Sequence, residues 1–446
     1  MTLDGGLFTT PAMTACFSDA ARLRTMLRVE AALAHMQADA GQAPAALAPA
    51  ILATTPDAAT IGTAAAIAGV PSIPFLKALQ SSLPPDLEPF VHQGATSQDL
   101  LDTAAVLLWR DALDLLAPQL YRILAGLAAL AEIHRATPCA GRTYGQHAAP
   151  VTFGYKAAGW LVGLADAATR LPALRDRVLV ASLGGPVGIY AGGPAQAEAF
   201  AAALGLGITP LCWHTGRGRV AALGAWLAEL LGALAKMATD IQHLATTEVA
   251  EVHEPSMPGR GGSSAMPHKR NPVGCTIILA AHMAAPGHVA TLLQAMAAAH
   301  ERPAGAWHAE WQALPALFGL TAAACREGAW LAEGLIVDPA RMRTNLDATK
   351  GLLFADRAAA LLTPALGRAG AHAHVEHAAA IVRDMGRNTG RSLQDVLGPD
   401  SAPAFDLAPA IEAAGPWIDR GLAHAVLARR ALAGVLHAKH NGERLA

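Results

Sequence analysis

The segment 259–272, GRGGSSAMPHKRNP, combines glycines, two hydroxyl side chains and several cations. Ser263 stands six residues before Lys269 and eight before Asn271. The stretch 255–300 contains no Asp or Glu, so sequence neighbours do not neutralise these cations. A serine is a poor base unless its anion is stabilised, and a positive loop with available backbone N–H groups stabilises it. The pattern therefore predicts abstraction of a proton next to a carboxylate, with a serine of this segment held in a positive field.

We refer to residues 259–272 as the Gly–Ser loop. Its glycines permit backbone conformations closed to other residues and favour a mobile flap. Lys269 and Asn271 are suited to hold a substrate carboxylate as it becomes an enediolate, and Ser264 and Met266 are further candidate substrate contacts. An ordinary surface loop is the alternative, but it leaves the spacing of hydroxyl, Lys and Asn unexplained. A nucleotide P-loop is excluded, because the order GxxxxGK[ST] does not occur.

A second polar cluster, HQGATSQD at 92–99, precedes a long predicted helix. Thr96, Ser97 and Gln98 offer hydroxyl and amide groups that can donate to a substrate carboxylate near a helix N-terminus. Helix capping by Thr96, Ser97 or Asp99 is the alternative, and the cluster alone favours it.

A third cluster, GRTYGQHAAP at 141–150, is polar and lies between predicted helices. It supplies four candidate substrate-binding residues: Arg142, Thr143, Gln146 and His147. Taken alone, the cluster is equally well explained as a connector with a structural histidine.

We predict neither a metal nor a nucleotide cofactor. The histidines and glutamate of 372–377 have spacings that could ligate a metal on one helix face, but a solvated helix surface is the more common outcome. The glycines of 184–193 do not form GxGxxG after a convincing strand, which argues against a dinucleotide site.

The composition indicates a large helical core or an oligomer interface. Of 446 residues, 53% are apolar and only 15% are charged. The formal net charge of −2 gives no global attraction to nucleic acid or anionic lipid. Five scattered cysteines without CxxC and the absence of a signal-peptide pattern favour the cytoplasm. The apolar stretch 276–299 contains His282, Pro286 and His288, so we expect a buried, kinked helix and no membrane span.

Helical periodicity dominates the chain. Seven apolar residues recur at spacings of four and three, which is typical of a bundle seam: Leu223, Leu227, Leu230, Leu234, Met237, Ile241 and Leu244. Further long helices are expected over 104–134 and 272–300. The first hundred residues (the head) and the residues after about 351 (the tail) are expected to form shorter helices. The prediction is an all-α protein with an N-terminal helical domain at 1–103, a long-helix bundle at 104–350 and a C-terminal helical domain at 351–446.

The stretch from Gly262 to Pro272 matches GSSxMPxKxNP, and with the two other clusters the chain resembles the fumarase/aspartase superfamily. The resemblance implies a homotetramer with a core of long helices, in which three subunits build each active site and no metal is needed. It also implies that Ser263 is the catalytic base. The positions it implies for substrate binding are Thr96, Ser97, Gln146, Lys269 and Asn271.

Within the superfamily, the chain is most similar to the bacterial 3-carboxy-cis,cis-muconate cycloisomerases. Superfamily lyases usually have Thr-His at 143–144 and often a glutamate at 276, where this chain has Thr-Tyr and Thr276. That pair assists amine or hydroxide departure. A carboxylate, with a parent-acid pKa of about 4, leaves without such help. The absence of both the histidine and the glutamate therefore favours a cycloisomerase that interconverts 3-carboxy-cis,cis-muconate and 4-carboxymuconolactone.

Three alternatives stay open. A related lyase that expels another good leaving group, such as nitrite from nitrosuccinate, also fits the missing pair. An adenylosuccinate-type amine lyase fits less well, and a structural protein of the lens-crystallin kind would not need Ser263, Lys269 and Asn271. Two departures from the cycloisomerase pattern suggest changed specificity: Gly216 and Gly218, and the bulkier loop Pro186–Tyr190.

Overall fold

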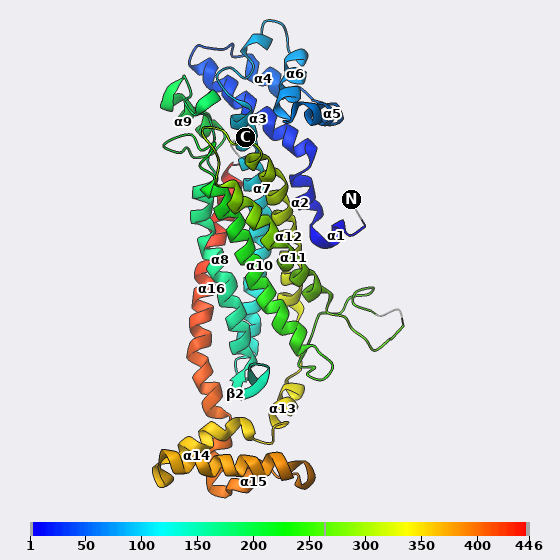
Figure 1. Ribbon diagram of the computed structural model, residues 1–446, viewed down its shortest axis with the longest axis vertical. Coiled ribbons are helices and arrows are strands. Elements are labelled where there is room, and N and C mark those ends of the chain that lie inside the picture. The colour runs from blue at the N-terminus through cyan, green and yellow to red at the C-terminus, as the bar shows by residue number, and fades with distance from the viewer. Residues whose placement is uncertain (1–2, 263–264, 443–446) are drawn as a thin grey trace.

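The computed structural model describes residues 3–262 and 265–442, without the side chains of 384–389 and 437–442. It is built almost entirely from helices, arranged as an elongated bundle with small helical layers at its two ends (Figure 1). The all-α prediction is confirmed. The bundle consists of α7 (Ser97–Ile133), α8 (Phe153–Val178), α10 (Gly218–Leu244), α11 (Val273–Ala295), α12 (Ala306–Gly334) and α16 (Ala408–Gly442).

The two ends of the bundle carry the shorter elements. The N-terminal elements are α1 (Gly5–Phe8), α2 (Pro11–Cys16), α3 (Asp19–Asp39), α4 (Leu47–Leu52), α5 (Ala58–Ala68), α6 (Ser72–Ser82) and η1 (Glu88–Phe90). Between bundle helices lie β1 (Pro138–Thr143), β2 (Gln146–Thr152), η2 (Gly185–Val187), α9 (Gly193–Ala203) and β3 (Val252–His253). The remaining elements are β4 (Ile336–Val337), α13 (Pro339–Asp347), η3 (Leu352–Phe354), α14 (Ala355–Thr389), α15 (Leu393–Leu397) and η4 (Pro399–Phe405).

Apolar burial holds the bundle together. All seven residues of the predicted seam lie on α10, and each is at most 4% exposed. A fully buried leucine side chain stabilises the folded state by roughly 1.5–3 kcal/mol relative to an exposed one. The seam is therefore the part of the core that the sequence predicted best.

The C-terminal prediction needs correction. We expected only shorter helices in the tail, but α16 runs through Gly415 and Pro416 and packs along α8 and α7 (Figure 1). A proline in the interior of a helix removes one backbone donor, a loss that the packing of α16 outweighs here. Of the proposed domain 351–446, only the part before α16 lies apart from the bundle, at the end where α14 and α15 lie.

The segment 141–150 also differs from the expected connector. It belongs to an antiparallel hairpin of β1 and β2, in which Pro138 pairs with Thr152 and Thr143 with Gln146. The turn places Tyr144 and Gly145 at positive φ, 51° and 75°. Period-2 alternation is too weak in this polar sequence to predict the hairpin.

Within the described part of the chain, three helices, α7, α10 and α11, are long and apolar enough to cross a membrane by length and composition. They pack against other bundle helices. However, α11 is not buried all round as expected, because Met283 is 80% exposed and Leu293 is 54% exposed. An apolar stripe of this kind is typical of a surface that another protein covers.

Candidate active site

Two of the three predicted motifs lie at opposite ends of α7 in a single chain. Thr96 and Ser97 stand at the start of α7, and the hairpin of β1 and β2 follows its other end (Figure 1). A helix of 37 residues is about 55 Å long at 1.5 Å per residue, so α7 separates these motifs by that length. The Gly–Ser loop lies between β3 and α11. One chain therefore does not bring the predicted residues together.

A capping box starts α7. The side chain of Thr96 accepts from the backbone of Asp99, and the Thr96 N–H donates to a carboxylate oxygen of Asp99 at 3.1 Å. Both interpretations of this segment are thus compatible, since Thr96 caps the helix and still lies near its positive end. Ser97 is half-buried beside it.

Gln98 points into the protein. Its side chain is fully buried, and its Nε2 donates to the carbonyl oxygen of His214 at 2.8 Å and to Asp102 at 3.2 Å. These contacts hold Gln98 in the interior, where it fixes the start of α7. Direct substrate binding would need its side chain to point outward.

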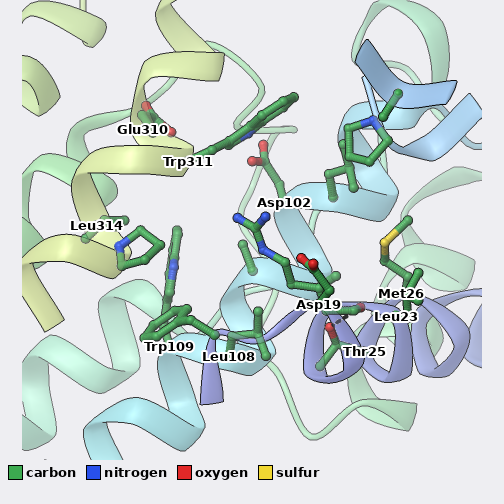
Figure 2. Close-up of a pocket in the computed structure, with 18 of the residues that line it drawn as sticks. Asp19, Leu23, Thr25, Met26, Asp102, Leu108, Trp109, Glu310, Trp311 and Leu314 are labelled. Atoms are coloured by element: carbon green, nitrogen blue, oxygen red, sulfur yellow. Dashed lines mark hydrogen bonds between the residues drawn. The ribbon is translucent and has the colours of Figure 1, made fainter. Parts of the chain in front are cut away.

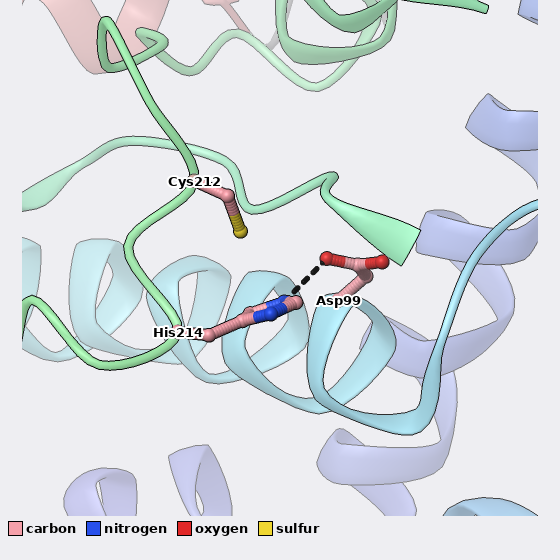
Figure 3. Close-up of side chains that lie close together, drawn as sticks. All are labelled: Asp99, Cys212 and His214. Atoms are coloured by element: carbon pink, nitrogen blue, oxygen red, sulfur yellow. Dashed lines mark hydrogen bonds and ion pairs between the residues drawn. The ribbon is translucent and has the colours of Figure 1, made fainter. Parts of the chain in front are cut away.

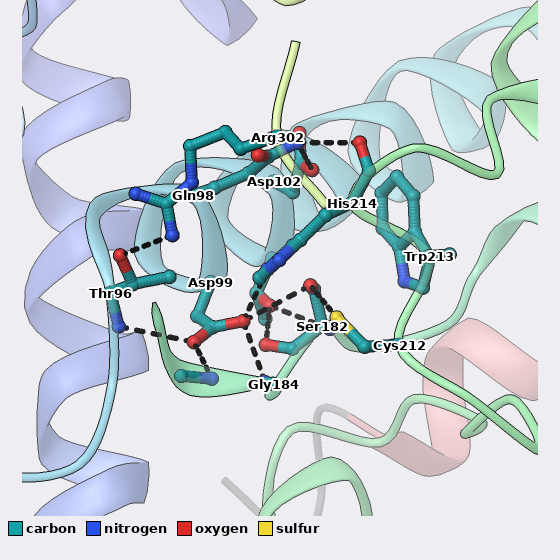
Figure 4. A network of polar contacts seen from close by, with 12 residues as sticks. Thr96, Gln98, Asp99, Asp102, Ser182, Gly184, Cys212, Trp213, His214 and Arg302 are labelled. Carbon is teal, nitrogen blue, oxygen red and sulfur yellow. Dashed lines mark hydrogen bonds and ion pairs between the residues drawn. The ribbon is translucent and has the colours of Figure 1, made fainter. Parts of the chain in front are cut away.

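Asp99 is the centre of a buried hydrogen-bond network (Figure 4). Its carboxylate accepts from the backbone N–H groups of Gly184 and Gly185, both at 2.8 Å, and from Ser182 Oγ at 3.3 Å. It also accepts from His214 Nε2 at 2.7 Å. Asp99 therefore holds the loop at 184–190 against the start of α7, a role that its place in the motif did not reveal.

The same carboxylate keeps His214 charged. Burial alone lowers the pKa of His214, but the hydrogen bond to Asp99 outweighs it and raises the pKa to about 9. Asp99, Cys212 and His214 are close enough to hold a metal ion (Figure 3). The Asp99 oxygens already accept from five donors, which a cation would have to displace.

This pKa predicts a loss of stability at alkaline pH. The unfolded histidine loses its proton near pH 6.5 and the folded one near 9, so the stabilisation is complete below pH 6.5 and lost as pH rises through 9. We expect the free energy of unfolding to fall by up to about 3 kcal/mol across this window. Urea unfolding of wild type and of His214→Gln at pH 6.5 and at pH 9 measures this fall in the free energy of unfolding. An equal fall in the two proteins would contradict the assignment.

Arg302 is a residue that the sequence interpretation missed. Its Nη2 donates to Thr96 Oγ1 at 2.7 Å and to the carbonyl oxygen of Pro186 at 3.1 Å (Figure 4). It is exposed and lies in the connection between α11 and α12, more than two hundred residues from Thr96. The only signal in the sequence was a cation in a polar connection.

The unusual loop Pro186–Tyr190 lies beside Thr96. Arg302 and Asp99 fix it there, and its Val187 and Ile189 side chains are 56% and 78% exposed. The second departure, Gly216 and Gly218, flanks Arg217 at the start of α10, where an added Cβ at either glycine would make ordinary contacts.

At the hairpin, Arg142 is committed to an ion pair. Its guanidinium donates to both carboxylate oxygens of the buried Glu251 at 2.5 and 3.0 Å, and Asn345 donates to the same group at 2.9 Å. Arg142 thereby joins the hairpin to the strand that leads into the Gly–Ser loop. Thr143 and Gln146 are exposed at its tip.

His147 is half-buried near the tip of the hairpin, where it lies opposite Arg142. Burial, with the positive charges of Arg142 and Lys156, lowers its pKa, so the imidazole is neutral at pH 7. A neutral imidazole can accept a proton, which is compatible with the predicted contact to substrate.

The described part of the Gly–Ser loop is open to solvent. Met266 and Lys269 are exposed, and Asn271 is half-buried. The Asn271 N–H donates to the carbonyl oxygen of Gly261 at 2.8 Å. This hydrogen bond joins the two ends of the loop, and we call the contact between Gly261 and Asn271 the neck of the loop. Ser263 and Ser264 lie outside the described residues.

A separate pocket of about 320 Å³ lies between the N-terminal helices and the bundle (Figure 2). Trp109, Trp311 and Leu314 form part of its apolar wall, and Asp102, Arg217 and Glu310 also line it. Among the described residues, none of those predicted to bind substrate lines this pocket. It is therefore distinct from the predicted site.

Comparison with known proteins places the chain in a family. Residues 7–287 match the family model described as lyase. The 3-carboxy-cis,cis-muconate cycloisomerase of Pseudomonas putida is 43% identical over 90% of this chain and 96% of its own length. The nitrosuccinate lyase of Streptomyces davaonensis is 44% identical over 86% of this chain and 84% of its own. The crystal structure of the 3-carboxy-cis,cis-muconate lactonizing enzyme from Pseudomonas putida superposes with a TM-score of 0.90 at 40% identity, covering 96% and 100% of the two chains. The chain belongs to this lyase family, within the fumarase/aspartase superfamily.

Proposed function

We propose that the protein is a cycloisomerase that interconverts 3-carboxy-cis,cis-muconate and 4-carboxymuconolactone. The carboxylate-expelling chemistry follows from Thr143-Tyr144 and Thr276, which leave no acid pair to assist a poor leaving group. The similarity to several cycloisomerases over most of the chain supports the same substrate. The exposed Val187 and Ile189 beside Thr96 provide an apolar surface for the carbon skeleton of such a substrate.

In the lactone-forming direction, a carboxylate oxygen of the substrate adds to the substrate's own double bond. The displaced π electrons form an enediolate on the neighbouring carboxylate, held by Lys269, Asn271 and N–H groups of the Gly–Ser loop. Ser263 delivers its proton to carbon and recovers one from water. No cofactor takes part in these steps, and no separate acid is assigned. His147 is a candidate, but its lowered pKa means that the imidazole must first take up a proton before it can donate one.

We further propose that the protein is a cytoplasmic homotetramer in which different subunits complete each site. The 55 Å length of α7 (37 residues at about 1.5 Å each) keeps Thr96 and Gln146 apart in one chain, so they meet only if different chains contribute them. The exposed apolar stripe of α11 supplies a surface for such assembly. Sedimentation or light scattering of the purified protein measures the assembly, and an active monomer would contradict the shared site.

A substrate screen tests the activity itself. Purified protein should change the ultraviolet absorbance of 3-carboxy-cis,cis-muconate or its lactone, and should act less well on nitrosuccinate and on amine adducts of fumarate. Faster turnover of nitrosuccinate would establish the second candidate, which the relative from Streptomyces davaonensis supports. No turnover of any of these acids would favour the non-catalytic, crystallin-like alternative.

Arg302 gives a prediction about substrate binding. We expect Arg302→Gln to lower kcat/KM about tenfold or more, mainly through KM, because a charge-assisted hydrogen bond near Thr96 is lost. Arg343→Gln, which removes an exposed arginine paired with Asp347, is the matched control and should change neither constant. Equal kinetics of the two variants would exclude Arg302 from the site.

A further inference from the structure

The neck of the Gly–Ser loop is tied to α12 by Arg260. The Arg260 guanidinium forms an ion pair with Glu327, whose side chain is 3% exposed, and lies over the ring of Trp330 at 5.4 Å. The sequence suggested that the cations of this loop lack acidic neighbours. That holds along the chain, but Arg260 finds an acidic partner on a distant helix.

The neck itself is narrow and well defined. The Asn271 N–H donates to the Gly261 carbonyl at 2.8 Å, and Gly261 has a φ of +72°. A Cβ at Gly261 would lie 2.7 Å from the Asn271 carbonyl oxygen, so a larger residue would separate the two strands of the neck. Arg260 immediately precedes this contact, so fixing its side chain fixes the start of the loop.

The same glutamate also contacts the N-terminal segment through a second arginine. Arg326 Nε donates to Glu327 at 2.8 Å. Its Nη1 donates to the carbonyl oxygens of Gly6 and Thr9 at 3.2 and 3.0 Å, and its Nη2 to Leu7 at 3.4 Å. A nearly buried carboxylate thus joins two segments that have no direct connection in sequence.

We infer that Glu327 is a positioning residue for the reaction, which holds the Gly–Ser loop through Arg260 and is itself held by Arg326 and the N-terminal segment. It does not touch the reacting atoms. Its effect on turnover rests on the proposed function, because Lys269 and Asn271 belong to the loop that Glu327 holds. Its effect on the loop does not rest on that function.

Limited trypsin digestion measures the effect on the loop. Trypsin can cut the loop after Arg260, Lys269 and Arg270, and the last two are exposed. In the full-length protein, Glu327→Gln should increase the rate of these cuts about tenfold, since charged hydrogen bonds to two arginines are weakened. It should lower kcat by a similar factor with little change in KM.

Glu333→Gln is the matched control. Glu333 also lies on α12 and pairs with an arginine, Arg122, but both side chains are about half exposed and the pair does not involve the loop. This variant should be cut and should turn over like wild type. Arg326→Gln covers the case in which Glu327→Gln does not fold, and should increase loop cutting by a smaller factor.

Wild-type rates of loop cutting in both Glu327→Gln and Arg326→Gln would overturn the inference. If Glu327→Gln does not fold, the rate in Arg326→Gln decides alone. If wild type acts on none of the screened acids, the proposed function fails, and the digestion still decides whether Glu327 holds the loop. A rise in cutting across the whole chain, seen by intact mass, would indicate general unfolding and would also count against it.

Discussion

Ser263→Ala should abolish measurable turnover and leave the assembly unchanged. General acid–base catalysis contributes about 10²–10⁴-fold, and here the base has no neighbouring side chain of the same chemistry except Ser264. The measurement is kcat with 3-carboxy-cis,cis-muconate at saturating concentration, together with the mass of the assembly in solution.

Ser264→Ala is the natural control for that experiment. It removes an identical hydroxyl one residue away and should retain most of the activity. Near-normal turnover of Ser263→Ala would refute the proposed base, and a loss confined to Ser264→Ala would transfer the role to the second serine.

Arg217→Met should strongly destabilise the folded protein. Arg217 is 1% exposed in its side chain and donates to Asp102 at 2.7 Å and to Glu310 at 2.9 Å. Its removal leaves two carboxylates buried together without a cation, which costs about 3–5 kcal/mol. Urea unfolding at fixed protein concentration measures the change.

The neighbouring Arg219→Met provides the comparison. Arg219 is half-buried, donates to the carbonyl oxygen of Arg177 and lies over the ring of Trp213 at 5.1 Å, but its loss leaves no buried carboxylate without a cation. Its replacement should therefore lower the free energy of unfolding by only about 1 kcal/mol. Equal destabilisation of the two variants would mean that Asp102 and Glu310 do not need Arg217 to offset their buried negative charges.

The sequence predicted those parts of the fold that depend on local periodicity. The seam on α10 is visible because every fourth and third residue is apolar, and the Gly–Ser loop is visible because its spacing is rare. The path of α16 back along α8 could not be predicted in this way, because tertiary packing outweighs the local signal of Pro416.

The site was only partly predictable for a related reason. Hydroxyls such as Thr96 and Ser97 belong to a compact sequence motif. Arg302 reaches Thr96 across 206 positions of the chain, and Glu327 reaches Arg260 across 67. Gln98 shows the converse, since it sits inside the motif yet faces the interior. Sequence proximity to a motif therefore does not establish contact with substrate.

The length of α7 has a genetic consequence. If different polypeptides contribute Thr96 and the Gly–Ser loop to each active site, two mutant alleles can complement each other in the same cell. One allele would carry its mutation near Thr96 and the other in the Gly–Ser loop. Some active sites of the mixed oligomers would combine intact segments from both gene products. Two recessive defects far apart along this gene would then restore growth together, whereas two defects within one motif would not.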